Sequence, residues 1–168
     1  LTEMEQRAER EGFPIIGPLV GPWLYTLTRM VGAQRVFELG SGYGYSTWYF
    51  CKAVQDNAAL TRSASAAVDE AGWTDANSGC AQVVHTVWDA QLSNDAQANL
   101  KRAGFADITT FIEGEAVAAL KNADGGWDVI RAAGSLDAST RCRYGTRCRS
   151  ASRSASCSTY PRSPGAAI

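Results

Sequence analysis

The sequence is poor in the residues on which several common kinds of site depend. Its 168 residues include one histidine and five cysteines, and no run of about 18 apolar residues occurs. The absence of such a run argues against a membrane-spanning helix. The cysteines are odd in number, and their spacing fits neither a zinc site nor a disulfide framework. The N-terminal residues lack the basic start and apolar run of a secretory signal, so we expect a cytoplasmic protein without a membrane partner.

The net charge of −1 is the sum of two regions with different compositions. Residues 1–130 carry nine Lys or Arg against sixteen Asp or Glu, whereas residues 131–168 carry seven Arg, eight Ser, three Cys and one acid. The second region holds no Phe, Trp, Val or Met and cannot bury enough apolar surface to fold alone. We therefore expect a folded core over 1–130 and an Arg/Ser/Cys-rich tail over 131–168.

Two origins are open for this tail: a disordered segment, or a shift of reading frame in the coding sequence, because the change of composition falls inside an apolar strand pattern. A third interpretation is that the Arg/Ser-rich tail binds nucleic acid. The small net charge of the whole chain argues against a nucleic-acid partner.

Strand and helix patterns alternate through the core. Apolar runs predict strands over residues 33–39, 82–88, 108–114 and, from its start only, 126–130. Helical spacing predicts helices over residues 3–11, 23–32, 46–54, 89–105 and 115–124. This alternation predicts an α/β fold, a Rossmann-like doubly wound parallel sheet that binds its ligand at the carboxyl ends of the strands.

Two stretches interrupt the alternation. Residues 13–22 contain three prolines and two glycines, which predicts a loop held by apolar side chains. Residues 55–81 are rich in Ala, Ser, Asp and Asn and form an irregular insertion, for which a helix at its start and a long loop are both open.

The strongest motif is VFELGSGYGYS, an apolar strand followed by a glycine-rich turn. Gly40, Gly42 and Gly44 permit positive φ angles and a close approach of main chain to a ligand, and Ser46 is a candidate N-cap for the next helix. The third glycine falls one residue earlier than in the dinucleotide fingerprint. Glu38 suits an amino-bearing or cationic ligand better than a pyrophosphate. The motif therefore predicts a nucleoside-cofactor site; the alternative is a tight turn without a ligand.

The segment FPIIGPLVGPWLYTLTRMVGAQRVFELGSGYGYST resembles the N-terminal half of class I methyltransferases that depend on S-adenosylmethionine (SAM). It is most similar to the small O-methyltransferases related to the catechol and caffeoyl-CoA enzymes, over residues 3–54 and 82–130. The resemblance implies SAM as cofactor, methyl transfer to a hydroxyl of a small-molecule acceptor, and a possible homodimer. It also implies a methyltransferase core that lacks its last strands here.

The resemblance carries over to individual residues around the turn. It places Glu38, Gly40, Ser41 and Gly42, with Gly44 in the same turn, along the methionine part of SAM; Tyr45 and Ser46 near the carboxylate; and Gly114, Glu115 and Ala116 beside the adenine. The family's ribose-binding acid corresponds to Val87, and Asp89 follows two residues later. Asp89 either replaces that acid or caps the following helix.

The resemblance also implies a Mg²⁺ ion that orients the acceptor, but its ligands are not found. WDVI is followed by RAAGSLDAST, with no acid where the family carries a metal-binding carboxylate, and Asp137 comes too late. The first hypothesis is therefore a SAM-dependent O-methyltransferase, and the second a catalytically inactive remnant that at most binds SAM. Two further residues have open roles: His85 as a general base or a buried side chain, and Trp88 as a flank of the adenine or part of the core.

Overall fold

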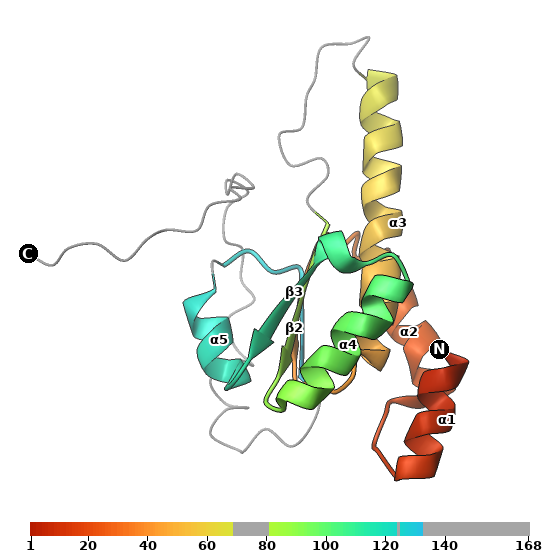
Figure 1. Ribbon diagram of the computed structural model, residues 1–168. Coiled ribbons are helices and arrows are strands. Elements are labelled where there is room, and N and C mark those ends of the chain that lie inside the picture. The colour runs from red at the N-terminus through yellow and green to blue at the C-terminus, as the bar shows by residue number, and fades with distance from the viewer. Residues whose placement is uncertain (69–80, 124, 133–168) are drawn as a thin grey trace, which may run out of the picture.

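The computed structural model describes residues 1–68, 81–123 and 125–132, which form an α/β fold (Figure 1). The predicted tail beyond Ala132 and most of the second half of the insertion lie outside the described residues. Within them, no helix is both long and apolar enough to cross a membrane.

Four parallel strands form the sheet, in the order β3-β2-β1-β4. They are β1 (Arg35–Leu39), β2 (Gln82–Val87), β3 (Thr109–Glu113) and β4 (Val129–Ala132). The chain adds β2 and β3 on one side of β1 and then returns to add β4 on the other side. The doubly wound parallel sheet predicted from the sequence is confirmed, and its strand order reverses between β1 and β4, where such sheets bind ligands.

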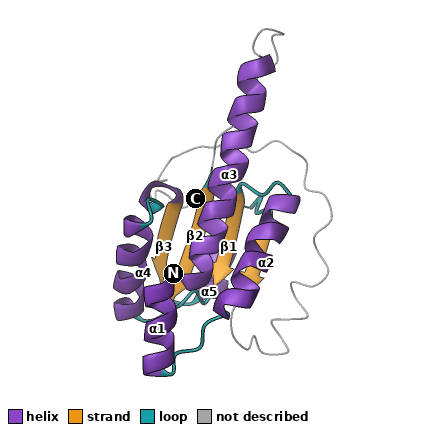
Figure 2. Ribbon diagram, turned by 90° about the vertical axis from the view of Figure 1, so that its right-hand side faces the viewer, coloured by secondary structure: helices purple, strands orange, loops and turns teal. Residues whose placement is uncertain are grey.

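Helices cover both faces of the sheet (Figure 2). One face packs against α3 (Tyr45–Val68) and α4 (Ala90–Arg102), through a core that includes Val36, Val83 and Leu100. The other face packs Phe37, Leu39 and Val84 against α5 (Ala116–Asn122). Successive side chains of a strand point to opposite faces, so the nearly continuous burial of β1 and β2 reflects coverage of the sheet on both sides.

Two N-terminal helices, α1 (Thr2–Glu11) and α2 (Gly17–Met30), precede β1, and a 3-10 turn, η2 (Ala106–Ile108), precedes β3. The prediction of a loop over 13–22 is wrong for its second half, because α2 begins at Gly17. Pro18 lies in the first helical turn, where a missing N–H costs no hydrogen bond, and Pro22 lies inside the helix.

The apolar spacing predicted for this helix is only partly used for packing. Leu24 packs against the core, whereas Trp23, Leu27 and Met30 leave half or more of their surface exposed.

Two further boundaries differ from the sequence prediction. The helix after the glycine turn begins at Tyr45, so Ser46 lies in its first turn and is not its N-cap. The same helix continues to Val68, which settles the start of the insertion as helix. At the other end, β4 includes Arg131 and Ala132, so the first two residues of the predicted tail belong to the sheet.

Candidate functional site

The glycine turn joins the end of β1 to the start of α3 and is held against β2. The main-chain N–H groups of Gly40 and Ser41 donate to the hydroxyl and carbonyl oxygens of Thr86, at 3.1 and 2.8 Å. Gly40, Gly42 and Gly44 have φ angles of 77°, 56° and 91°, a region that side chains with a Cβ rarely adopt. The alternating glycines are therefore required by the course of the main chain.

Gly42 also permits a close contact with the loop between α1 and α2. A Cβ at residue 42 would lie 3.1 Å from the Phe13 ring. That ring in turn packs against Tyr43, with 4.8 Å between ring centroids. The Tyr43 hydroxyl donates to the Met4 carbonyl oxygen at 3.0 Å, and the Tyr45 hydroxyl bonds to the Glu5 carboxylate. The tyrosine side chains thus attach α1 to the turn, and burial raises the pKa of both phenols.

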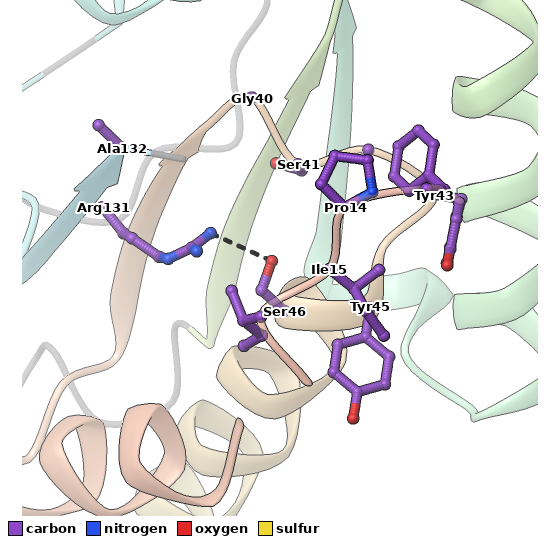
Figure 3. A pocket seen from close by; sticks show the side chains of 12 residues that line it. Pro14, Ile15, Gly40, Ser41, Tyr43, Tyr45, Ser46, Arg131 and Ala132 are labelled. Carbon is purple, nitrogen blue, oxygen red and sulfur yellow. Dashed lines mark hydrogen bonds between the residues drawn. The ribbon is translucent and has the colours of Figure 1, made fainter. Parts of the chain in front are cut away.

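A cavity of about 440 Å³ opens beside this turn, at the point where the strand order reverses (Figure 3). Three segments line it: the loop between α1 and α2, the glycine turn with the first residues of α3, and the end of β4. The lining residues are Phe13, Pro14, Ile15, Ile16, Gly40, Ser41, Gly42, Tyr43, Tyr45, Ser46, Arg131 and Ala132. Its volume falls in the range of small-molecule and cofactor sites.

Behind the cavity lies a buried polar network centred on Glu38, whose side chain is 0% exposed. One carboxylate oxygen accepts from the Arg131 Nη1 at 2.6 Å and the other from the Thr47 hydroxyl at 2.6 Å. Because Thr47 donates its single hydrogen to Glu38, its oxygen accepts from His85 Nδ1, 3.0 Å away. The network links β4, β1, α3 and β2.

His85 does not reach the cavity and is fully buried. Burial lowers its pKa to about 4, against the opposite influences of the Glu38 carboxylate and the main chain of Gly42, so the ring is neutral at pH 7. Its Nε2 atom has no hydrogen-bond partner among the described residues. The structure therefore supports the buried role, and the ring is not among the residues that line the cavity.

Arg131 was not predicted as a site residue, because the composition of the sequence places it in the Arg-rich tail. The residue pairs with Glu38 in the register of β4 on β1, and its Nη1 also donates to the Ser46 hydroxyl at 3.2 Å (Figure 3). A signal was present: Arg131 follows Val129 at the two-residue period of the strand and lies opposite a buried acid. The loop residues Phe13–Ile16 also gave no sign of lining a cavity, because their apolar character is equally expected of core residues.

Gly44 belongs to the glycine turn but does not line the cavity; a Cβ at this residue would lie 3.3 Å from the Ala96 side chain of α4. The other four predicted site residues lie at the carboxyl ends of β2 and β3 and do not line the cavity. The Asp89 carboxylate caps α4 by accepting from the Leu92 N–H at 2.9 Å. The Glu115 carboxylate caps α5, next to Ala116, by accepting from the N–H groups of Val117 and Ala118.

Two other residues lie at this end of the sheet. The Gly114 N–H donates to the Val87 carbonyl oxygen at 3.0 Å, which holds the loop after β3 beside the end of β2. Trp88 is 75% exposed, so the alternative that places its side chain in the core is wrong.

The described residues do not fit a Mg²⁺ site. No three His, Cys, Asp or Glu side chains gather anywhere among them. The acid nearest the end of β4, Glu38, already accepts from Arg131 and Thr47. A guanidinium at this end of the sheet repels a divalent cation, so no chemical step is assigned to a metal here.

The fold is shared with solved methyltransferase structures. A methyltransferase from Geobacter sulfurreducens is 24% identical and superposes with a TM-score of 0.52, covering 70% of this chain and 50% of that one. An O-methyltransferase from Bacillus cereus in complex with SAH (S-adenosylhomocysteine) is 20% identical and superposes with a TM-score of 0.59, covering 79% of this chain and 52% of that one. The O-methyltransferase TomG from Streptomyces achromogenes, in complex with SAM, is 18% identical and superposes with a TM-score of 0.58, covering 78% of this chain and 51% of that one.

These superpositions show the fold alone, and the chain spans about half the length of each of these neighbours. No curated protein matches the sequence. The model of a family described as "Methyltransferase domain" matches residues 37–153, which includes the glycine turn and β4 and extends beyond the described residues. Because this match covers more than half of the sequence, the chain belongs to the methyltransferase domain family.

Proposed function

We propose that this chain binds SAM at the carboxyl edge of its sheet and transfers the methyl group to a hydroxyl of a small-molecule acceptor. The observation that carries the proposal is the cavity between β1 and β4, lined by the glycine turn of the segment that matches the methyltransferase family. A topological switch point is where open α/β sheets bind their ligands.

The proposed pose follows the edge of the sheet. The methionine part of SAM enters the cavity, where Gly40 and Gly42 allow the main chain to approach it and α3 directs its N-terminus toward it. The nucleoside extends toward the ends of β2 and β3, past Trp88 and Gly114. Gly114 supports this direction because its hydrogen bond to Val87 brings the two strand ends together.

The proposed reaction is an in-line displacement. The acceptor oxygen attacks the methyl carbon, the carbon–sulfur bond breaks, and sulfur keeps the electron pair, so SAM becomes neutral at sulfur. The proton of the acceptor hydroxyl is released to bulk solvent. The contribution of the chain is to hold donor and acceptor in line and to exclude water, and positioning of this kind can supply much of the rate. The O-methyltransferase neighbours from Bacillus cereus and Streptomyces achromogenes support a hydroxyl acceptor for a chain of this fold.

A second candidate function is SAM binding without methyl transfer. It is favoured by the end of β4, where the cation Arg131 faces the cavity and the described residues offer no acid free to orient an acceptor hydroxyl.

Calorimetric titration of the full chain with SAM and SAH, followed by transfer assays with radiolabelled SAM, tests these proposals. Catechols and hydroxycinnamoyl compounds are the acceptors to use. Binding of SAH with label transferred to an acceptor oxygen supports the first function. Binding without transfer to any acceptor supports the second, and absence of binding contradicts both.

A further inference from the structure

The sequence predicted that Glu38 presents a negative charge to the ligand, but the structure places a different charge at the cavity. Glu38 is 0% exposed and is not a lining residue, whereas Arg131 lies between it and the cavity and lines the wall. Among the twelve described lining residues, Arg131 carries the only formal charge. A ligand group that reaches this wall therefore meets a guanidinium, with the Glu38 carboxylate paired behind it.

We propose that Arg131 binds the carboxylate of the cofactor's methionine end and makes the cavity selective for ligands that carry this carboxylate. The inference rests on the proposed function, since it assumes that SAM occupies the cavity. It assigns a specific recognition role to a residue at the end of β4.

The geometry of the guanidinium supports this role. Nη1 is used internally, because it donates to Glu38 at 2.6 Å and to the Ser46 hydroxyl at 3.2 Å. Nε and Nη2 make no hydrogen bond to any residue that the structure describes. These two nitrogens form one edge of the guanidinium, and such an edge can donate two parallel hydrogen bonds to a carboxylate.

Glu38 gives the guanidinium a fixed position. An arginine side chain loses rotamer freedom when it binds a ligand, and this loss weakens binding unless the side chain is already ordered. Here the 2.6 Å contact to a buried carboxylate and the parallel register of Glu38 with Arg131 hold the side chain across the end of β1 before any ligand enters (Figure 3).

The end of α3 beside Arg131 also favours a carboxylate. Tyr45 and Ser46 are the first two residues of α3, and both line the cavity. The N-terminus of a helix attracts negative charge through its unpaired N–H groups and its dipole. A carboxylate near Ser46 would be close to both this helix end and the Arg131 guanidinium, whereas an ammonium group in that place would be repelled by both.

The test compares SAH with decarboxylated SAH, the same molecule without its carboxylate, by calorimetry on the full chain. We expect the unmodified protein to bind SAH at least tenfold more tightly than the decarboxylated ligand. Arg131→Gln should reduce the affinity for SAH about tenfold to a hundredfold, and that for the decarboxylated ligand less than threefold, so the preference disappears. Arg131→Lys keeps the positive charge but loses the planar guanidinium, so it should retain part of the preference for SAH.

Two controls separate recognition from folding. Arg102→Gln removes an exposed arginine that pairs with Glu3; neither residue lines the cavity, so this variant should leave both affinities unchanged. The double variant Glu38→Gln/Arg131→Gln avoids leaving a buried carboxylate unpaired, and it should show the same loss of preference as Arg131→Gln.

The outcomes are distinct. If Arg131→Gln weakens both ligands by the same factor, or weakens neither, Arg131 does not recognise the carboxylate and the inference is wrong. A preference of the unmodified protein for the decarboxylated ligand would also overturn it, because the ammonium group would then be the recognised group. Failure of the unmodified protein to bind either ligand would refute the proposed function, and the assignment of Arg131 with it.

Discussion

The two halves of the sheet's carboxyl edge use acidic residues in different ways. At the β1–β4 half, Glu38 lies within a strand, is completely buried, and pairs with Arg131 beside a cavity. At the β2–β3 half, Asp89 and Glu115 each follow a strand, are exposed, and cap the helix that comes next. The parallel strands of both halves end at the same edge of the sheet. Of the two, the β1–β4 half alone has a buried charged pair beside a cavity.

The difference follows from topology and from distance along the chain. Asp89 and Glu115 find their partners two or three residues away, at helix N-termini that the chain itself creates. Glu38 has a partner 93 residues later, which reaches it only because β4 returns to the far side of β1. An acid at a strand end therefore forms either a local cap or a long-range pair, and stability and binding measurements can tell the two apart.

The largest effect is expected from breaking the buried pair. Glu38→Ala leaves the Arg131 guanidinium without its counter-charge and the Thr47 hydroxyl without its acceptor, so the free energy of unfolding should fall by about 3 kcal/mol. Urea denaturation measures it, and a double-mutant cycle with Arg131→Met isolates the interaction between the two side chains. A loss below about 1 kcal/mol would mean that the cavity hydrates Arg131 and that the two halves of the edge do not differ in this respect.

The next effect concerns the pH dependence of stability, which we expect His85, at the buried end of the same network, to influence. Burial lowers the pKa of His85 from 6.5 to about 4, so between these values the unfolded chain binds a proton that the folded chain does not. The contribution to stability is complete above pH 6.5 and declines toward pH 4, by at most about 3 kcal/mol. Urea denaturation at several pH values should show this decline. The variant His85→Asn cannot titrate, so the part of this decline that comes from His85 should be absent from it. If the free energy of unfolding of the variant depends on pH as steeply as that of the unmodified protein, the decline does not come from His85.

A smaller effect separates main-chain strain from cavity geometry. Gly42→Val and Gly32→Val both place a branched side chain at a positive φ, of 56° and 63°, so each should lower the free energy of unfolding by about 2 kcal/mol. Only Gly42 has a cavity residue against its Cβ position, the Phe13 ring at 3.1 Å, whereas Gly32 has open space. We therefore expect SAH affinity to fall at least tenfold for Gly42→Val alone. Equal affinities in the two variants would remove the turn from the binding site.

The smallest effect is expected at the β2–β3 half. Asp89→Ala removes the cap of α4 and should cost about 1 kcal/mol, whereas Asp89→Ser keeps a capping oxygen and should restore most of it. Asp89→Ser lacks the two oxygens that a ribose would use. We expect its SAH affinity to change less than threefold; a tenfold loss with stability restored would instead assign Asp89 to the ribose.

Much of the fold was predictable because its signals are local. The apolar runs of β1 to β3, the periodicity of α4 and the glycines of the turn each depend on a few neighbouring residues. The prediction was wrong where tertiary packing outweighs local propensity: α2 includes Pro22 because the helix packs along α3, and α3 begins one residue before the expected cap. Five of the eleven predicted site residues line the cavity, and Glu38 lies directly behind it.

The sequence by itself determined that a strand, a glycine turn and a helix follow one another at Val36 to Ser46, because positive φ angles and apolar runs are properties of adjacent residues. Only the tertiary structure decided which charge the cavity presents. Composition assigned Arg131 to a polar tail, but the parallel register of β4 places it opposite Glu38 and across the cavity wall. Charge pairing between residues 93 positions apart depends on strand order, and strand order is set by how the helices pack on the two faces of the sheet.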